Sequence, residues 1–263
     1  MENRQPSPES IAQYSTTGRL SARIALHRDY STAAQSWHRW LFDQLDFPDG
    51  ARVLDAGCGT GELWRANRDR LCGWFVTLSD QSAAMGSGAA QALSSAGSYT
   101  AHEGDVQALD FADASFDGTL ACHMLYHVPD IAQGLRELRR VLRPGGRLFA
   151  ATNSQEHMGE LLGLIRELDP GVDTTHSGYR FTLENGEPML RQAFGVCELR
   201  IFDDSLRVTK AQPLMDYILS LALSFRRLRT ADGQTAALAE IQRRIDTEGP
   251  IVISKRAGVF VCR

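Results

Sequence analysis

An apolar segment that runs directly into three alternating glycines constrains this chain more than any other feature. Residues 53–61 read Val-Leu-Asp-Ala-Gly-Cys-Gly-Thr-Gly, and a helical pattern follows them. Glycine permits tight turns and admits a ligand against the main chain, because it has no Cβ. In an open α/β sheet, ligands bind beyond the carboxyl ends of the strands. The segment therefore predicts a buried strand and a ligand-binding loop, although plain strand-to-helix turns also use such glycines.

The spacing of these glycines limits which classes of ligand the loop is expected to bind. The pattern is GxGxG led by the acid Asp55, whereas dinucleotide folds carry GxGxxG and phosphate loops carry GxxxxGK[ST]. No lysine follows Gly61 within the next turn, so a triphosphate would lack its usual countercharge. We infer that phosphate does not define the ligand.

Short strand-like runs and longer helical runs alternate beyond this loop. Strands are predicted at residues 52–56, 74–78, 99–103, 116–121, 147–152, 197–203 and 251–261, and helices at 82–95, 131–142, 184–194 and 215–245. Before the loop, residues 20–45 have mostly helical spacing, with a break near residues 29–32. Alternation of this kind implies right-handed crossovers. The expected fold class is α/β, with a doubly wound, mostly parallel, seven-stranded Rossmann-like sheet.

Composition excludes several classes of protein. The chain is 43% hydrophobic and 23% charged, which is ordinary for a globular protein. Its net charge of -4 provides no positive field for a phosphate backbone, so nucleic acid is not an expected partner. No apolar run approaches the ~20 residues that cross a bilayer, and residues 1–20 lack the apolar core of a signal peptide. We expect a cytoplasmic protein without membrane contact.

The cysteines predict neither a metal site nor a disulfide framework. They are odd in number and scattered, without a CxxC pair or a Cys/His cluster at zinc spacing. We therefore expect free thiols in a reducing cytosol and no metal. The five are Cys58, Cys72, Cys122, Cys197 and Cys262.

Two further acids follow the next two predicted strands. Asp80 comes about 20 residues after the glycine loop, where a carboxylate can accept hydrogen bonds from both hydroxyls of a ribose. Asp105 follows the third strand and can accept a bond from an adenine amino group. A single Asp at a strand end also serves as a helix cap or a solvated turn. Three acids at successive strand ends favour a nucleoside-containing ligand.

The segment from Val53 to Asn153 closely resembles the class I S-adenosylmethionine-dependent methyltransferases of the small-molecule, type 11 kind. The resemblance covers about two-fifths of the chain. It lies in the acid-led glycine loop, Asp80, Gly104-Asp105-Val106, the run from Phe116 to Val128, and Leu142-Arg143-Pro144-Gly145-Gly146-Arg147-Leu148. It implies S-adenosylmethionine as cofactor, with S-adenosylhomocysteine as product, and an antiparallel end to the sheet.

The resemblance also implies roles for individual residues. The methionine part would lie at the glycine loop, the ribose at Asp80, the adenosine along Gln81 and Met85, and the adenine at Asp105. The backbone near Cys122 would lie beside the sulfonium. The implied cofactor-binding residues are Asp55, Gly57, Cys58, Gly59, Gly61, Asp80, Gln81, Met85, Gly104, Asp105, Val106, Cys122 and His123.

On this interpretation the chain divides into four consecutive parts. Residues 1–46 form an N-terminal helical lid, and residues 47–154 form the cofactor-binding half of the core. Residues 155–193 form a substrate-side insertion, and residues 194–263 complete the core. The first and third parts lie where the family varies, so the substrate is not carried over.

Transfer of an activated methyl group needs alignment more than covalent help. Where the acceptor carries a proton, a base must remove it, and histidine suits that task near neutral pH. His123 and His127 follow the fourth strand with Tyr126 between them, and these three are the candidate catalytic residues. The alternative is structural, with an imidazole bonded to backbone and the aromatic ring packed on the cofactor.

Aromatic residues outside the matching segment suggest an apolar acceptor. The candidate substrate-binding residues are Tyr30, Trp37, Tyr126, His127 and Tyr179. We expect methylation of a small molecule, an aromatic or heteroaromatic compound of secondary metabolism, at nitrogen, oxygen or carbon. The alternatives are a nicotinamide-dependent oxidoreductase and a non-catalytic protein that binds S-adenosylmethionine. The sequence gives no information on oligomeric state.

Overall fold

The computed structural model describes residues 17–70, 73–93, 98–174, 180–221 and 223–263. The chain forms two compact units, and each is built from stretches that are distant in sequence. One unit, here called the sheet unit, comprises the described residues of Gln35–Gln155, Ser177–Phe202 and Ala257–Arg263. The other, the helical unit, comprises those of Met1–Ala34, Glu156–His176 and Asp203–Arg256. The predicted boundaries at residues 46, 154 and 193 stay a prediction.

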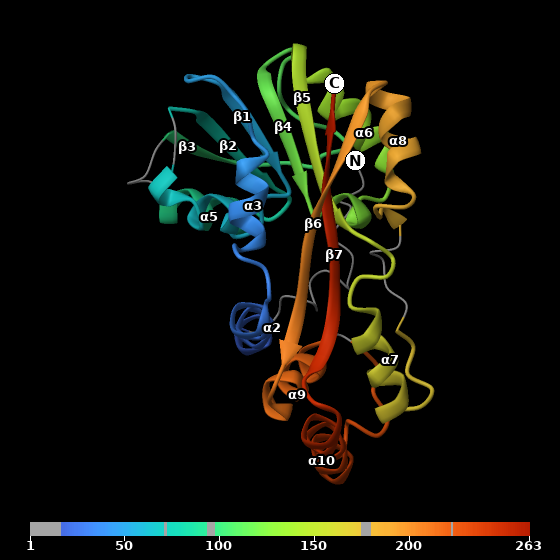
Figure 1. Cartoon of the computed structure of the whole chain (residues 1–263). Coiled ribbons are helices and arrows are strands. Elements are labelled where there is room, and N and C mark those ends of the chain that lie inside the picture. Colours follow the sequence, from blue (N-terminus) through green and yellow to red (C-terminus); the bar gives the residue numbers. More distant parts are fainter. Residues whose placement is uncertain (1–16, 71–72, 94–97, 175–179, 222) are drawn as a thin grey trace. The chain divides into compact units, whose positions relative to one another are not determined.

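A seven-stranded sheet organises the fold, in the order β3-β2-β1-β4-β5-β7-β6 (Figure 1). β1 pairs in parallel with β2 on one side and with β4 on the other. β3 and β5 extend the parallel part outward, and β7 runs antiparallel to β5. The strands are β1 (Arg52–Ala56), β2 (Phe75–Asp80), β3 (Ser98–Glu103), β4 (Phe116–Cys122), β5 (Leu142–Asn153), β6 (Cys197–Val208) and β7 (Ile251–Cys262). The predicted mostly parallel α/β fold is confirmed.

Helices cover both faces of the sheet unit, so its central strands are buried on both sides and consist mainly of apolar residues. On one face, α6 (Ile131–Arg140) and α8 (Gly186–Phe194) pack through Leu135, Leu138 and Leu190. The other face is covered by helices whose buried residues form a second cluster with Val53, Val76 and Leu120. These helices are α3 (Trp37–Asp43), α4 (Glu62–Arg65) and α5 (Ala83–Leu93).

The helical unit contains α2 (Thr17–Tyr30), α7 (Gly159–Leu168), α9 (Ala211–Ser220) and α10 (Ala231–Glu248). Residues 203–208 of β6 and 251–256 of β7 also belong to it. Its buried Asp204 accepts hydrogen bonds from Ser31 Oγ at 2.8 Å and Ala33 N at 3.0 Å, and it forms an ion pair with Lys255. This carboxylate joins the end of α2 to the strand residues of the same unit.

Two boundaries differ from the sequence prediction. β5 begins at Leu142, five residues before the predicted start, because Leu142 pairs with Phe116 ahead of a register shift. The helix predicted over residues 215–245 is two helices, α9 and α10. The Thr230 side chain caps α10 by accepting a hydrogen bond from Gly233 N, which favours a new start at that point. Within the described ranges, no helix combines the length and apolar character needed to cross a bilayer.

The prediction of free thiols is wrong for two cysteines. Cys197 of β6 and Cys262 of β7 form a disulfide, with Cα atoms 4.1 Å apart. Sixty-five positions separate them in sequence, and the adjacency of β6 and β7 brings them together. Cys58 and Cys122 are free, as predicted, and Cys72 lies outside the described residues.

We predict that reduction of this disulfide lowers the free energy of unfolding by about 2–4 kcal/mol, because it releases a long loop in the unfolded chain. Urea denaturation with and without dithiothreitol measures the effect. A Cys197→Ser/Cys262→Ser double variant is the control, and its stability should not respond to the reductant. Recovery of both thiols as alkylated cysteines from unreduced protein would contradict the prediction.

Candidate active site

The glycine loop after β1 has the backbone geometry that its sequence predicted. Gly57, Gly59 and Gly61 have φ values of 70°, 53° and 71°, in the left-handed region that favours glycine. A Cβ on Gly57 would meet Met124 at 2.8 Å, and one on Gly61 would meet Ala89 at 2.9 Å. A Cβ on Gly59 would meet nothing within 4 Å. The loop is therefore packed at both ends and open at its centre.

Hydrogen bonds join this loop to the end of β2. The backbone N–H groups of Gly57 and Cys58 both donate to Ser79 O, at 2.8 and 3.0 Å. The half-buried Asp80 accepts from Gly59 N at 3.0 Å and from Ser82 N at 2.9 Å. The predicted ribose acid thus also fixes the loop and the start of α5. Gln81 is exposed and Met85 is half-buried at the same edge of the sheet.

Asp55 is a buried acid with one unpaired oxygen. It lies on β1 and is 3% exposed. Its Oδ2 accepts a hydrogen bond of 2.8 Å from Trp64 Nε1. Its Oδ1 has no hydrogen-bond partner within the described residues. The pKa of Asp55 is raised to about 7. Burial is the main cause, the hydrogen bond from Trp64 opposes the shift, and the nearby Asp80 adds to it.

Burial keeps the two nearby thiols protonated. It raises the pKa of Cys58, and the charges of Asp55 and Asp80 add to that shift. Burial also raises the pKa of Cys122, at the end of β4, with Asp55 as the second cause. A protonated thiol is a poor nucleophile. Both cysteines are therefore suited to lining the site and not to covalent chemistry.

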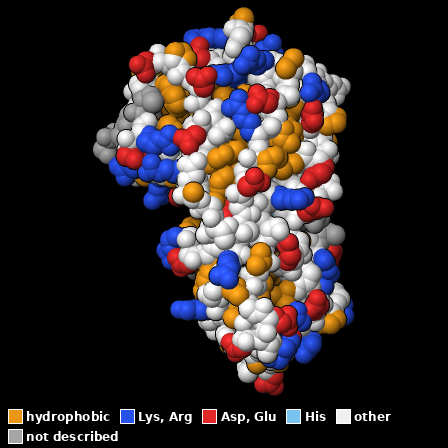
Figure 2. Space-filling view, viewed as in Figure 1, with side chains coloured by type: hydrophobic (Ala, Val, Ile, Leu, Met, Phe, Trp, Pro, Cys, Tyr) orange, Lys and Arg blue, Asp and Glu red, His pale blue; other side chains and the backbone are white. Residues whose placement is uncertain are grey.

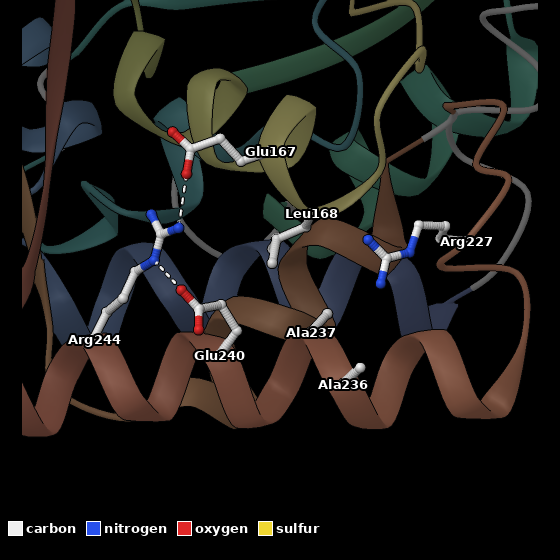
Figure 3. Close-up of a pocket in the computed structure, with 7 residues that line it drawn as sticks. All are labelled: Glu167, Leu168, Arg227, Ala236, Ala237, Glu240 and Arg244. Atoms are coloured by element: carbon white, nitrogen blue, oxygen red, sulfur yellow. Dashed lines mark hydrogen bonds and ion pairs between the residues drawn. The ribbon is translucent and has the colours of Figure 1, made fainter.

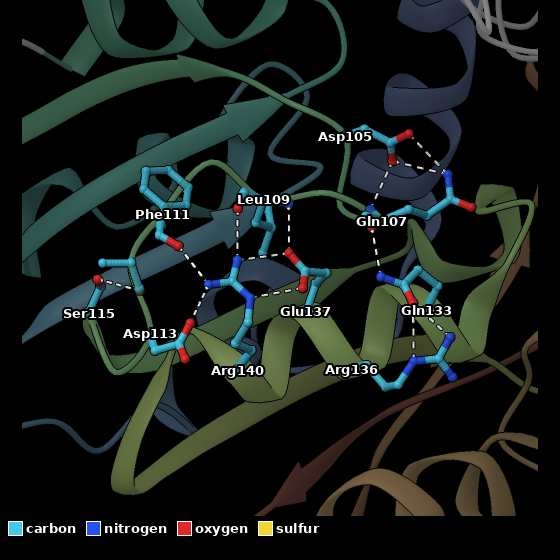
Figure 4. A network of polar contacts seen from close by, with 11 residues as sticks. Asp105, Gln107, Leu109, Phe111, Asp113, Ser115, Gln133, Arg136, Glu137 and Arg140 are labelled. Atoms are coloured by element: carbon cyan, nitrogen blue, oxygen red, sulfur yellow. Dashed lines mark hydrogen bonds and ion pairs between the residues drawn. The ribbon is translucent and has the colours of Figure 1, made fainter. Parts of the chain in front are cut away.

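The end of β3 is held against α6 by a polar network (Figure 4). Gly104 N donates to Asp80 O at 3.1 Å, which ties β3 to β2. Asp105 Oδ1 accepts from Gln107 N at 2.9 Å, and Gln107 Oε1 accepts from Asp130 N at 2.9 Å. The neighbouring Val106 is buried. Gln107, which sequence reasoning did not single out, thus orients the predicted adenine acid.

The same network anchors the loop between β3 and β4. Arg140 of α6 donates to Leu109 O at 2.8 Å and to Phe111 O at 2.7 Å (Figure 4). Glu137 accepts from Leu109 N at 2.9 Å and from Arg140 Nη2 at 2.8 Å. These hydrogen bonds restrain the loop, and with it the neighbouring segment that carries Asp105.

His123 marks the end of β4. Its φ is 54°, an uncommon value for a residue other than glycine, and its N–H donates to Ala151 O at 2.9 Å. The short helix η2 (Leu125–His127) follows. Within it, the rings of Tyr126 and His127 lie 4.5 Å apart in an edge-to-face arrangement. The left-handed turn at His123 therefore directs the chain from β4 into the segment that carries the other candidate catalytic residues.

An aromatic cluster contacts His123. The Trp37 ring centroid lies 5.1 Å from that of His123 and 5.3 Å from that of Trp40. Phe202 of β6 lies 5.5 Å from Trp37 and 5.3 Å from Trp40. The structure thus brings Trp37 to a candidate catalytic residue. Phe202 was missed, because a phenylalanine in a strand is indistinguishable from a core residue by sequence.

For two predicted substrate residues the role stays a prediction. Tyr30 belongs to the helical unit, and Tyr179 lies outside the described residues. A hollow of about 250 Å³ also lies in the helical unit and includes Arg227 in its lining (Figure 3). There Arg244 pairs with Glu167 and Glu240, each at 2.7 Å. None of the predicted cofactor residues lines it, so we do not assign it as the active site.

Comparison with known proteins identifies the segment that carries this geometry. Residues 54–150 match the model of the family described as "Methyltransferase domain". These residues form a class I methyltransferase domain. The resemblance inferred from the sequence is thereby confirmed for these residues, and with it S-adenosylmethionine as the cofactor that this family implies.

Curated relatives match part of this chain. A malonyl-[acyl-carrier protein] O-methyltransferase of Erwinia pyrifoliae is 41% identical over 59% of this chain and 57% of its own length. A ubiquinone/menaquinone biosynthesis C-methyltransferase of Paracoccus denitrificans is 38% identical over 49% of this chain and 50% of its own. The chain therefore spans about half the length of the curated relatives it matches.

Solved structures share the fold over most of the chain. An S-adenosylmethionine-dependent methyltransferase of Thermotoga maritima aligns with a TM-score of 0.57, covering 96% of this chain and 97% of its own. Its sequence is 16% identical, so this likeness concerns the fold alone.

The residues of the methyltransferase domain fit the cofactor. The unpaired Oδ1 of Asp55 is a buried acceptor that an ammonium group would satisfy. The open space at Gly59 lets a ligand approach the backbone, and Asp80 is partly accessible. These features lie at the carboxyl ends of neighbouring parallel strands, where this class of fold binds its ligands.

We predict that Gly59→Val abolishes cofactor binding and leaves the sheet folded, because its side chain would fill the open space at the loop. Gly50→Val is the matched control. Gly50 also has a positive φ and nothing within 4 Å of its Cβ position, but it precedes β1 in a turn. Both variants should lose similar stability through strain, about 1–2 kcal/mol. Calorimetry with S-adenosylhomocysteine separates them, and normal binding by folded Gly59→Val would remove the loop from the site.

Proposed function

We propose that this protein transfers the methyl group of S-adenosylmethionine to a small-molecule acceptor. The observation that carries the proposal is the buried, unpaired oxygen of Asp55 beside an open glycine loop, in a segment that matches the methyltransferase domain. An acceptor atom left unsatisfied in a dry site costs free energy unless a ligand satisfies it. A cationic amino group would do so.

We assign the cofactor-binding roles by strand end. Asp55 and the glycine loop would bind the methionine part, and Asp80 would accept hydrogen bonds from the ribose. Gln81 and Met85 would line the adenosine. Gly104, Asp105 and Val106 would lie at the adenine, and Cys122 with His123 would lie near the sulfonium.

When bound, S-adenosylmethionine supplies a methyl group already activated for in-line displacement. The chain's own contribution is to align the acceptor, which can lower the barrier by several kcal/mol. The acceptor's lone pair forms the new bond to the methyl carbon as the carbon–sulfur bond breaks. Where the acceptor carries a proton, His123 or His127 would take it. Cys58 and Cys122, as protonated thiols, would take no part in the transfer.

The acceptor we favour is aromatic or heteroaromatic. Trp37, together with Trp40 and Phe202, offers flat apolar surface next to His123. The two relatives described above methylate oxygen and carbon, so the acceptor atom is not inherited from them. Positive and negative side chains intermingle over the face in Figure 2, so that face carries no broad positive patch that would attract a polyanion.

A cytoplasmic location stays a prediction from the sequence. The disulfide between Cys197 and Cys262 bears against it, because a reducing cytosol disfavours structural disulfides.

Incubation with methyl-labelled S-adenosylmethionine and a metabolite extract, followed by mass spectrometry, tests the function. Transfer of label to a small aromatic compound is the expected result. Cofactor binding without transfer to any acceptor would favour the non-catalytic alternative. Thermal stabilisation by a nicotinamide cofactor, and not by S-adenosylhomocysteine, would favour an oxidoreductase.

With the acceptor identified, we predict that His127→Asn or His123→Asn lowers turnover by about 10²–10⁴-fold, the usual contribution of a positioned base. Cofactor affinity should change little, because neither imidazole is assigned to hold the nucleoside. At saturating S-adenosylmethionine, the pH profile of kcat should lose its acidic limb. Near-normal turnover of both single variants and of the double variant would show that alignment alone accounts for catalysis.

A further inference from the structure

Trp64 is the side chain that contacts the buried acid directly. It lies in α4, which begins immediately after the glycine loop, and it is 0% exposed. Its ring packs edge-to-face against Phe42 and Tyr99, with centroids 6.3 and 5.9 Å away. These contacts restrain the indole, and its Nε1–H donates to Asp55 Oδ2 at 2.8 Å.

This bond makes the two oxygens of Asp55 unequal. An indole N–H only donates, so Oδ2 is held as an acceptor. The carboxyl group then cannot rotate freely, and Oδ1 remains the oxygen without a partner among the described residues. Fixing a carboxylate in advance removes part of the entropy cost of binding a ligand to it.

Opposing effects act on the ionisation of Asp55. Burial and the charge of Asp80, at the end of β2, raise the pKa of Asp55, and Asp55 in turn raises the pKa of Cys58 in the glycine loop and of Cys122 at the end of β4. Asp80 thus opposes ionisation of Asp55. The Trp64 N–H acts in the opposite direction by stabilising the carboxylate.

We propose that Trp64 is a positioning residue for cofactor binding: its indole N–H holds Oδ2 of Asp55, so that Oδ1 is directed at the ammonium group of the cofactor. This inference rests on the proposed function and deepens it. Loss of the N–H would leave a carboxyl group that ionises less readily and rotates more freely. Affinity for a cationic amine would then decline at a higher pH than in the unaltered protein.

Trp64→Phe and Trp74→Phe form a matched pair of variants. Trp74 lies in the same apolar cluster and stacks on the same Phe42, with centroids 5.6 Å apart. Its Nε1 is buried without a hydrogen-bond partner in the described part of the chain. Both changes remove an indole from one cluster, and only Trp64→Phe removes a bond to Asp55.

The experiment is calorimetric titration of the full chain with S-adenosylhomocysteine between pH 5.5 and 9. In the unaltered protein, affinity should fall as the pH drops through the pKa of Asp55, because the protonated acid no longer attracts the ammonium group. In Trp64→Phe the midpoint should move up by about one pH unit, giving about tenfold weaker binding at pH 6, as expected for loss of one hydrogen bond to a charged group. Trp74→Phe should keep the midpoint of the unaltered protein.

Several outcomes would overturn the inference. A Trp64→Phe profile that superimposes on that of the unaltered protein would do so, as would an equal shift in Trp74→Phe. If Trp64→Phe does not fold, Asp55→Asn, which keeps an acceptor for Trp64, provides a second test. Its affinity should be weak and should not fall further at low pH, and a retained pH dependence would overturn the inference. Failure of the unaltered protein to bind S-adenosylhomocysteine would instead count against the proposed function.

Discussion

Parallel pairing of β1 with both β2 and β4 is the constraint on which the candidate site depends. Parallel strands end at the same edge of the sheet, so this pairing brings Asp55, Asp80 and His123 to one edge although they are far apart in sequence. The pairing of β2 with β3 adds Asp105 to the same edge. The acids of the candidate site lie at or near the ends of these strands.

The same edge holds an acid in an environment that disfavours its charge. Burial raises the pKa of Asp55 to about 7, so the folded protein favours the protonated acid. The contribution of this group to stability is therefore greatest below its ordinary pKa of about 4 and is lost as the pH rises through about 7. An apolar residue at this position would avoid that loss. An acid here is understandable if a cationic ligand compensates for it.

Local patterns made much of the fold predictable. Residues 53–61 alone indicated a strand, a tight loop and a ligand edge, because glycine spacing and apolar runs are properties of neighbouring residues. The disulfide was not predictable in this way, since Cys197 and Cys262 meet only through the adjacency of β6 and β7. The break between α9 and α10 was also missed, because apolar spacing continues across it.

The same distinction between local patterns and tertiary contacts applies to the candidate site. Its acids and glycines could be named from the sequence, and their binding roles stay predictions. Trp64 and Phe202 could not be named, because a buried aromatic residue in a helix or strand has the same pattern whether it packs in the core or orients a functional group. For Trp64, the hydrogen bond from its N–H to Asp55 distinguishes an orienting role from core packing. Proximity in sequence placed Tyr30 and Trp37 in one lid, and the structure assigns them to different compact units, so the shared lid stays a prediction.

The strand order has a consequence for synthesis on the ribosome. β7 lies between β5 and β6, yet it is the last strand to be made. Until it emerges, β5 presents an unpaired edge and β6 has no neighbour in the sheet, although both have already been translated. Exposed strand edges are the usual starting points of misassembly. The nascent chain therefore passes through a stage in which five strands can form a sheet and the sixth must wait, and that interval is where chaperone protection would matter most.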